Sequence, residues 1–370
     1  MRFTEFSGEW KEELLYRIAT LSKGIGIPKE QLSEDGDPCI LYGELYTKYK
    51  SEIIKQVESK TDIDGSKLKR SKANDVIIPC SGETAVDIAT ARCVPFDSIL
   101  LGGDLNVISL HKYDGAFMSY QLNGKRKYDI ARVAQGVSVV HLYGEHLKTI
   151  KTYNPTLPEQ QKIAILLSLL DERIATQNKI IEDLKKLKSA ISERLFKSVK
   201  GSTVLLSDLC DIVKGKQING ENLSDSGNYY VMNGGTEPSG YYDNYNVEAS
   251  TISISEGGNS CGYVQFNTSP FWSGGHCYSI QNIADKVDNM YLYHYLKSNE
   301  DAIMKLRIGS GLPNIQKKDL AMFKIIVPKI EWQIKISTFL SSLERKAEIE
   351  ERIQNVMQKQ KLYLLQQMFI

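Results

Sequence analysis

The sequence predicts an α+β protein in which two mixed globular domains alternate with two long helices that pair as an antiparallel coiled coil. Three observations predict this architecture: a gap-free internal repeat, a heptad pattern inside that repeat, and short strand patterns outside it. The expected boundaries are 1–155 for the first globular domain, 156–200 for the first helix, 201–328 for the second globular domain and 329–370 for the second helix. A chain of 370 residues has room for two or three such domains, each with its own core.

The composition is that of an ordinary globular protein. Hydrophobic residues make up 42% and charged residues 25%, which excludes a disordered or collagen-like chain. Apolar runs such as Ile163 to Leu170 are too short to span a bilayer, and no apolar signal core follows Met1, so we expect a cytoplasmic protein. Because the formal net charge is only +1, binding to nucleic acid would require locally basic surfaces.

The internal repeat is long. Leu147–Phe196 aligns with Leu320–Phe369 at a constant offset of 173 residues. Two shorter blocks also match, Arg132–Val137 with Arg307–Leu312 and Leu15–Gly24 with Leu206–Gly215. Between these blocks the two halves diverge strongly. We therefore infer that the helices do one job twice, while the globular domains do two different jobs of the same kind.

The first helix is expected to begin with Thr156 as N-cap and Glu159 as its capping-box partner. Its apolar seam alternates steps of four and three residues through Ile163, Leu167, Leu170, Ile174, Gln177, Ile181, Leu184, Lys188, Ile191 and Leu195. The same register in the second helix is poorer, running through Ile336, Leu340, Leu343, Ala347, Glu350, Gln354, Met357, Lys361, Leu364 and Met368. Ile349, Ile353 and Val356 offer the second helix a shifted alternative.

Two interpretations of these helices remain open at this stage. They are either two ordinary core helices or partners of each other, and a length of roughly 40 residues, well above the globular mean, favours pairing. Since each helix follows its own globular domain, antiparallel pairing would place one domain at each end of a rod about 60 Å long.

The second globular domain is rich in turn signals and short strand patterns. We expect strands at 251–255 and 262–266 and a helix at 288–298. Four loops carry amide, hydroxyl and cationic groups that suit phosphates and base edges, namely 214–217, 233–235, 256–260 and 273–276. For any one of these loops taken alone, a simple turn is the favoured interpretation.

Several enzyme signatures are missing from the sequence. There is no P-loop motif, no Asn/Asp-Pro-Pro-Tyr/Phe run typical of amino-methyltransferases, and no pair of carboxylates beside a lysine as a nuclease site needs. Six scattered cysteines form no C-x-x-C pair, which favours buried reduced thiols over a zinc site or a disulfide framework. We therefore expect a non-catalytic protein without a metal site.

The repeated segment resembles a known family. Residues 155–174, beginning Pro-Thr-Leu-Pro-Glu-Gln-Gln-Lys-Ile-Ala, are similar to the central repeat of the specificity subunits of Type I restriction-modification systems. Residues 6–10, Phe-Ser-Gly-Glu-Trp, look like the usual opening of that family. Residues 233–241, 253–262 and 271–277 resemble one class of its target-recognition domains. The resemblance covers essentially the whole chain.

The resemblance implies a DNA-binding role. Each globular domain would be a target-recognition domain that reads one half of an asymmetric, bipartite double-stranded DNA target, and the helices would set the spacer. Two methyltransferase subunits would dock on the chain, and motor-nuclease subunits would join them. S-adenosylmethionine, ATP and magnesium would be used by these partners and not by this chain.

We expect phosphate contacts from basic residues and base contacts from loop side chains. The candidates in the first domain are Lys23, Arg70, Lys72, Arg126 and Arg132. Those in the second domain are Lys214, Lys216 and Arg307, with Asn233, Asn259 and His276 as base-edge readers. Arg132 and Arg307 share a repeat position, which favours either a phosphate contact or a contact between domain and helix.

Two alternative functions remain. One is a helical-rod scaffold that joins proteins without binding DNA, and the other is a self-sufficient DNA-modifying enzyme. Salt-dependent, sequence-selective DNA binding would separate the first from the family function, and methyl transfer by the chain alone would support the second.

Overall fold

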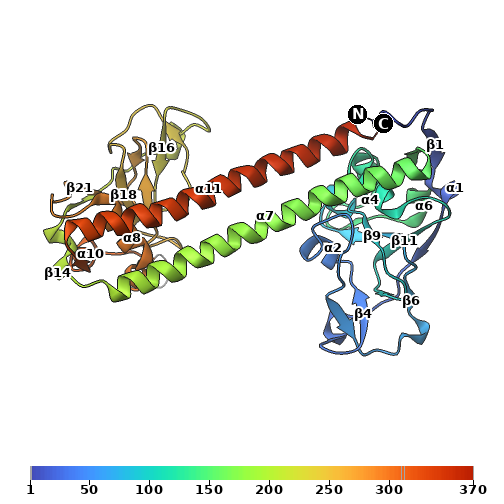
Figure 1. Ribbon diagram of the computed structural model, residues 1–370, viewed down its shortest axis with the longest axis horizontal. Coiled ribbons are helices and arrows are strands. Elements are labelled where there is room, and N and C mark those ends of the chain that lie inside the picture. Colours follow the sequence, from blue (N-terminus) through green and yellow to red (C-terminus); the bar gives the residue numbers. More distant parts are fainter. Residues whose placement is uncertain (1, 310, 312, 370) are drawn as a thin grey trace. The chain divides into compact units, whose positions relative to one another are not determined.

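The computed structural model describes residues 2–309, 311 and 313–369 and divides the chain into two compact units (Figure 1). Unit 1 contains the residues up to Lys179 and those from Arg352 onward, and unit 2 contains Ile180–Glu351. Both long helices, α7 (Leu157–Ser198) and α11 (Ile330–Gln367), pass from one unit into the other. Each unit therefore holds one globular head and a segment of each helix. We call residues 2–154 the first head and residues 202–327 the second head.

The first head is built on a four-stranded antiparallel sheet in the order β2-β11-β7-β9. The strands are β2 (Ala19–Lys23), β11 (Leu105–Leu110), β7 (Asp75–Pro79) and β9 (Arg92–Val94). Strand β7 is buried on both faces, because alternate residues belong to different cores. Val76 and Ile78 pack with α4 (Gly115–Asn123) and its neighbours, whereas Ile77 packs toward the second sheet.

A five-stranded sheet completes the first head, in the order β3-β5-β4-β10-β6. Its strands are β3 (Leu32–Ser33), β5 (Ser59–Thr61), β4 (Asp37–Ile40), β10 (Leu100–Leu101) and β6 (Lys69–Arg70). The remaining elements of the first head are β1 (Lys11–Leu14), α1 (Leu15–Ile18), η1 (Lys29–Gln31), α2 (Glu44–Thr47), η2 (Gly65–Lys67), β8 (Ser81–Gly82), α3 (Ala85–Ile88), α5 (Lys127–Val133), β12 (Val140–His141), α6 (Gly144–Lys148) and β13 (Lys151–Asn154).

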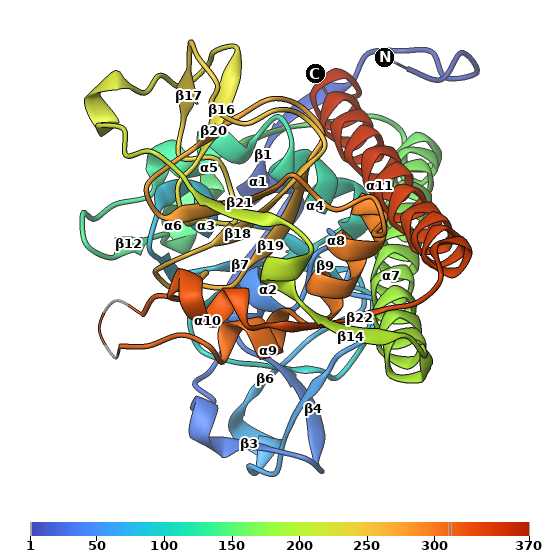
Figure 2. The same cartoon turned by 90° about the vertical axis from the view of Figure 1, so that its left-hand side faces the viewer.

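The second head also contains a four-stranded antiparallel sheet, in the order β15-β21-β18-β19 (Figure 2). Its strands are β15 (Asp211–Lys214), β21 (Cys277–Gln281), β18 (Thr251–Ser255) and β19 (Val264–Asn267). A three-stranded sheet, β17-β16-β20, stands in place of the five-stranded one. The other elements are β14 (Ser202–Leu205), η3 (Leu206–Asp208), η4 (Gly220–Asn222), β16 (Tyr229–Met232), β17 (Tyr241–Tyr242), β20 (Trp272–Ser273), α8 (Asn289–Ser298), α9 (Glu300–Met304), α10 (Lys317–Ala321) and β22 (Lys324–Val327).

The repeat therefore extends further than the sequence analysis inferred. The two heads diverge in sequence, yet their four-stranded sheets share one strand order, and each is followed by a capped helix, α4 or α8. Asp114 and Asp288 cap these helices by accepting the amides of Phe117 and Tyr291. The difference between the heads lies in the second sheet and the loops. A shared sheet survives sequence change because a core needs apolar residues of suitable size more than particular identities.

In each unit the two helix segments run antiparallel. In unit 1, Lys361 of α11 pairs with Asp171 of α7, and in unit 2, Lys188 of α7 pairs with Glu344 of α11. The predicted seam is confirmed for both helices, since each of its twenty positions is buried or half-buried. The shifted alternative for the second helix is wrong, because Ile349, Ile353 and Val356 are all exposed.

One glutamine at the start of each helix fastens the helix to its head. The side chain of Gln160 accepts the amide of Asp114 at 2.9 Å and donates to the carbonyl of Pro155 at 2.8 Å. Gln333 makes the same pair of bonds, to Asp288 at 2.9 Å and Pro328 at 2.8 Å. Both glutamines are buried, so each junction is a satisfied polar contact.

The start of α7 carries an acidic residue, Glu159, that has no acidic counterpart at the same repeat position of α11. Thr156 precedes the helix as predicted, and its carbonyl accepts the amide of Gln160. Glu159 is fully buried and binds the guanidinium of Arg2 through two hydrogen bonds of 2.7 and 2.8 Å. This carboxylate therefore anchors the N-terminal segment of the first head.

The far end of each helix packs on a head through an aromatic residue at equivalent repeat positions. Phe196 at the end of α7 contacts Tyr291 and Tyr295 of α8, with ring centroids 5.8 and 5.2 Å apart. Phe369, just after α11, contacts Phe117 at 5.3 Å and Trp10 at 6.4 Å. Trp10 is therefore a packing residue of the first head. No helix among the described residues is long and apolar enough to cross a membrane.

Candidate nucleic-acid interface

The four loops predicted separately in the second head come together in space. Backbone hydrogen bonds join Gly215 to Cys277 at 2.8 Å, Lys216 to Ser273 at 2.9 Å and Gly274 to Met232 at 2.8 Å. The Ser255 hydroxyl donates to the carbonyl of Gly234 at 2.7 Å, which ties the 233–235 loop to the end of β18. Loops 214–217, 233–235, 256–260 and 273–276 therefore form one surface, which we call the four-loop surface.

Glycines make this close approach possible. A Cβ on Gly215 would lie 2.2 Å from the carbonyl oxygen of Gly274, and one on Gly275 would lie 2.3 Å from the Gln217 side chain. Gly234 has a φ of +85°, a left-handed conformation that glycine adopts at little cost. These glycines are more than generic turn residues, because atoms of one loop occupy the space beside the next, and at Gly215 these atoms are backbone.

A buried carboxylate lies beneath the four-loop surface. Glu256 is 5% exposed, and its Oε1 accepts hydrogen bonds from Lys214 Nζ at 2.7 Å and from the Tyr278 hydroxyl at 3.0 Å. Its Oε2 lies 3.8 Å from His276 Nδ1 and has no hydrogen-bond partner among the described residues. Glu256 lies in one of the four predicted loops but is not among the predicted site residues, because burial of a loop carboxylate leaves no local sequence signal.

The predicted residues of the second head fall into two groups. Lys214 and His276 are exposed and meet at Glu256, whereas Asn233 uses its side-chain oxygen to accept the His276 amide at 3.1 Å. Asn233 thus holds the loop of His276 in place. The other three candidates, Lys216, Asn259 and Arg307, are exposed on or beside the surface.

Arg307 reaches this region through backbone pairing. Ile308 pairs with Asn314, and Asn314 pairs in turn with Gly257 of the four-loop surface. The repeat block 307–312 includes residues 310 and 312, which lie outside the described part of the chain. The repeat partner of Arg307, Arg132, is 79% exposed and pairs with Asp129 at 3.5 Å. The shared role of these two arginines stays a prediction.

The candidates of the first head are spread over several elements. Lys23 is the last residue of β2, and its Nζ lies 5.8 Å from the ring centroid of Tyr143. Arg70 is exposed and binds Asp37 at 2.8 Å, and Lys72 is exposed two residues later. Arg126 is 13% exposed and pairs with Asp129 at 3.2 Å, with its guanidinium 5.0 Å from the Tyr153 ring. These contacts favour a packing role for Arg126.

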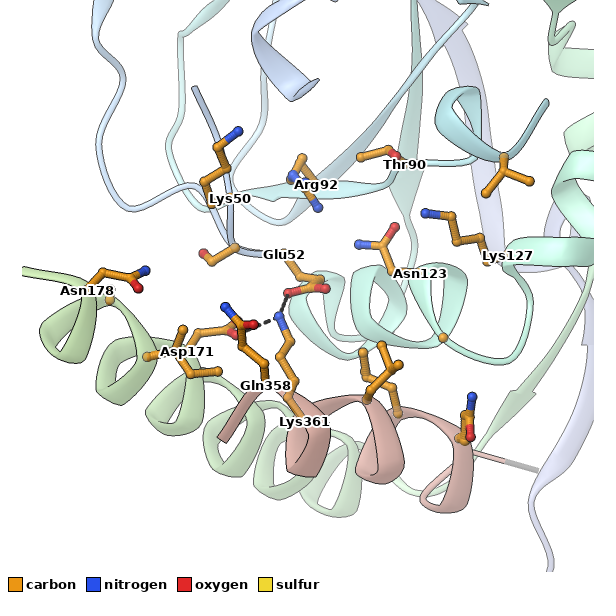
Figure 3. Close-up of a pocket in the computed structure, with 18 of the residues that line it drawn as sticks. Lys50, Glu52, Thr90, Arg92, Asn123, Lys127, Asp171, Asn178, Gln358 and Lys361 are labelled. Carbon is orange, nitrogen blue, oxygen red and sulfur yellow. Dashed lines mark hydrogen bonds and ion pairs between the residues drawn. The ribbon is translucent and has the colours of Figure 1, made fainter. Parts of the chain in front are cut away.

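A separate cavity of about 820 Å³ lies in unit 1 between the first head and the two helices (Figure 3). Lys361 projects from α11 between Glu52 of the head and Asp171 of α7, with Nζ 2.6 Å from an oxygen of each. Tyr120 of α4 donates a hydrogen bond to Asp171 at 2.7 Å. Burial opposes the charged form of Lys361, but the two carboxylates outweigh it and raise the pKa of its ammonium. These charges hold the head to the helices.

Comparisons with known proteins match this architecture. A family model described as the Type I restriction modification DNA specificity domain matches residues 8–186 and again residues 200–359. The chain belongs to this family. The two matches correspond to the two copies of head and helix, so the resemblance inferred from the repeat is confirmed.

Individual relatives cover less of their own length. A protein of Mycoplasma genitalium named as a type I specificity subunit is 34% identical over 32% of this chain and 31% of its own. One of Mycoplasma pneumoniae is 32% identical over 39% of this chain and 38% of its own. The chain thus spans about a third of the length of these curated relatives.

A solved structure agrees over the whole chain. The crystal structure of the Type I restriction-modification S subunit from M. genitalium covers 100% of this chain and 99% of its own, with a TM-score of 0.69 and 19% identity. This likeness confirms the predicted fold class of two mixed heads with long helices.

Proposed function

We propose that this chain is the DNA-recognition subunit of a Type I restriction-modification complex and has no catalytic role of its own. Each head would read one half of a bipartite double-stranded DNA target. The observation that carries this proposal is the four-loop surface, where exposed Lys214, Lys216 and His276 lie on adjoining glycine loops. Cationic side chains suit phosphates, and loop side chains held by a rigid sheet suit base edges.

The proposed target is asymmetric. The two heads share a four-stranded sheet, but the side chains at the end of that sheet differ. Cys80 of the first head occupies the position of Glu256 in the second head, because the backbone amide and carbonyl of both residues make matching hydrogen bonds. Different side chains on one scaffold favour two unlike half-sites over a palindrome.

The proposed partners are two methyltransferase subunits and the motor-nuclease subunits. Their docking is supported by large exposed apolar residues on the helices of both units, including Ile165, Leu169 and Val356 in unit 1 and Trp332 and Phe339 in unit 2. Such residues favour protein contacts over a solvated face. S-adenosylmethionine, ATP and magnesium would be used by these partners.

We also propose that the chain acts in the cytoplasm. All six cysteines are buried and free, as the sequence predicted, which suits a reducing compartment.

The decisive test is methylome sequencing of cells that express this chain with its methyltransferase partner. We expect one bipartite, asymmetric adenine-methylated motif that disappears when the chain is omitted. DNA binding by the purified complex should weaken steeply as salt rises. Absence of both motif and binding would favour a protein scaffold, which the exposed apolar residues of the helices also suit. Methyl transfer by the purified chain alone would instead support an enzyme.

A further inference from the structure

The two heads can be matched residue by residue at the end of their shared sheet, because the same backbone hydrogen bonds recur there. The amide of Leu142 donates to the carbonyl of Cys80 at 2.8 Å, and the amide of Ile315 donates to that of Glu256 at 2.8 Å. These matching bonds make Cys80 and Glu256 equivalent, although the two residue types differ.

Two further pairs of residues are equivalent in the two heads. Cys80 donates its amide to Asp104 at 2.7 Å, and Glu256 donates its amide to His276 at 2.9 Å, so Asp104 corresponds to His276. In strand register, Lys23 pairs with Asn106 and Lys214 pairs with Tyr278, so the two lysines correspond as well. Each head therefore presents a lysine and one exposed polar residue at the same end of the same sheet.

In the second head, Glu256 links these two residues. One carboxylate oxygen holds Lys214 at 2.7 Å, and the other is buried without a partner 3.8 Å from His276 Nδ1. An unpaired buried carboxylate oxygen is costly, so a small approach of the imidazole would satisfy it. With Nδ1 turned toward Glu256, Nε2 is the ring nitrogen left for a ligand, and the His276 side chain is 61% exposed.

The backbone also fixes His276 in this place. Asn233 accepts its amide at 3.1 Å, and a Cβ on Gly234 would lie 3.1 Å from the His276 Cβ. In the first head, Asp104 stands on a backbone with φ of +58° and accepts a hydrogen bond from the Ser81 hydroxyl at 3.3 Å. Both residues are therefore held by their loops while their side chains remain exposed.

We infer that Asp104 and His276 are the equivalent base-reading residues of the two heads, and that Glu256 is a positioning residue that aims His276 and Lys214 at DNA. This inference rests on the proposed function. A carboxylate only accepts hydrogen bonds when ionised, so Asp104 would contact the exocyclic amine of cytosine in the major groove. The equivalent lysines, Lys23 and Lys214, would contact phosphates, and such contacts carry no information about the base sequence.

The test uses the full chain with its methyltransferase partner and reads the methylated motif. His276→Asn should change or relax one base position of one half-site, with a loss of discrimination of roughly 5- to 100-fold, while the other half-site is unchanged. Asp104→Asn should act on the opposite half-site and shift its preference toward adenine, which asparagine contacts through two hydrogen bonds.

Glu256→Gln separates positioning from mere support of the fold. It keeps the side-chain size and should relax the same base position as His276→Asn, whereas the exposed control Glu221→Gln should change nothing. A Glu256→Gln variant that loses thermal stability and affinity without a change of base preference would overturn the positioning role. If it fails to fold, Glu256→Asp and His276→Asn carry the test.

Two outcomes would overturn the inference in different ways. If the wild type methylates a bipartite motif but His276→Asn and Asp104→Asn leave both half-sites unchanged, the base-reading assignment fails and the proposed function stands. If the wild type directs no bipartite methylation, the proposed function fails and this inference fails with it.

Discussion

Replacing Lys361 by methionine should destabilise unit 1 strongly. The substitution keeps the aliphatic stem but removes an ammonium that lies 2.6 Å from both Glu52 and Asp171. The three side chains are only 15, 8 and 6% exposed, so the carboxylates lose their counter-charge without gaining water. Removing one partner of a buried ion pair typically costs about 3–5 kcal/mol. For a unit of this size, that corresponds to a fall in Tm of roughly 6–20 °C.

The assay is urea unfolding of the full chain followed by the fluorescence of Trp10, which lies in unit 1, with Trp272 and Trp332 replaced by phenylalanine. Lys359→Met is the matched control, because Lys359 is exposed on the same helix and should change stability by less than about 0.5 kcal/mol. Adding Glu52→Gln to Lys361→Met should recover part of the loss. A cost below about 1 kcal/mol for Lys361→Met would refute the reasoning.

Three further predictions address the second unit, the junctions and the helices. Burial lowers the pKa of His294 to about 4. As the pH falls below about 6.5, His294 is therefore protonated in the unfolded chain before it is protonated in the folded chain. The free energy of unfolding of unit 2 should fall by about 3 kcal/mol between pH 6.5 and 4. His294→Gln should flatten that part of the stability curve in urea unfolding, and an unchanged slope would contradict the assignment. Gln160→Ala and Gln333→Ala each leave buried backbone groups unpaired and should cost about 2–4 kcal/mol in thermal unfolding; a loss under about 0.5 kcal/mol would count against the junction role. Inserting four residues after Lys179 in α7 and four after Glu351 in α11 lengthens each helix by about 6 Å. The methylated motif should then gain about one or two base pairs of spacer. An unchanged spacer would contradict the proposal that the helices set the spacer length.

The sequence by itself determined the repeated helices and the family. Heptad spacing is a local property, so α7 and α11 lie within two or three residues of the predicted boundaries. Thr251–Ser255 and the helix capped by Asp288 were also predictable, because alternation and capping act over a few residues. The choice between the two seams of the second helix was not predictable from the sequence, because burial of Leu340 or Ile353 depends on which face meets the partner helix.

Only the tertiary structure decided which loop residues meet. Lys214, Glu256 and His276 are far apart along the chain, and they come together because β15, β18 and β21 are neighbours in one sheet. Strand order depends on long-range pairing, which leaves no trace in local spacing. The correspondence of Asp104 with His276 has a trace in the sequence, because each residue follows a Gly-Gly pair, but only the shared strand pairing shows that the two pairs are equivalent. Lys23 and Lys214 could be aligned from the residues that precede them. The repeat in the sequence thus fixed the helices, while the shared sheet revealed that the heads are also copies of one scaffold.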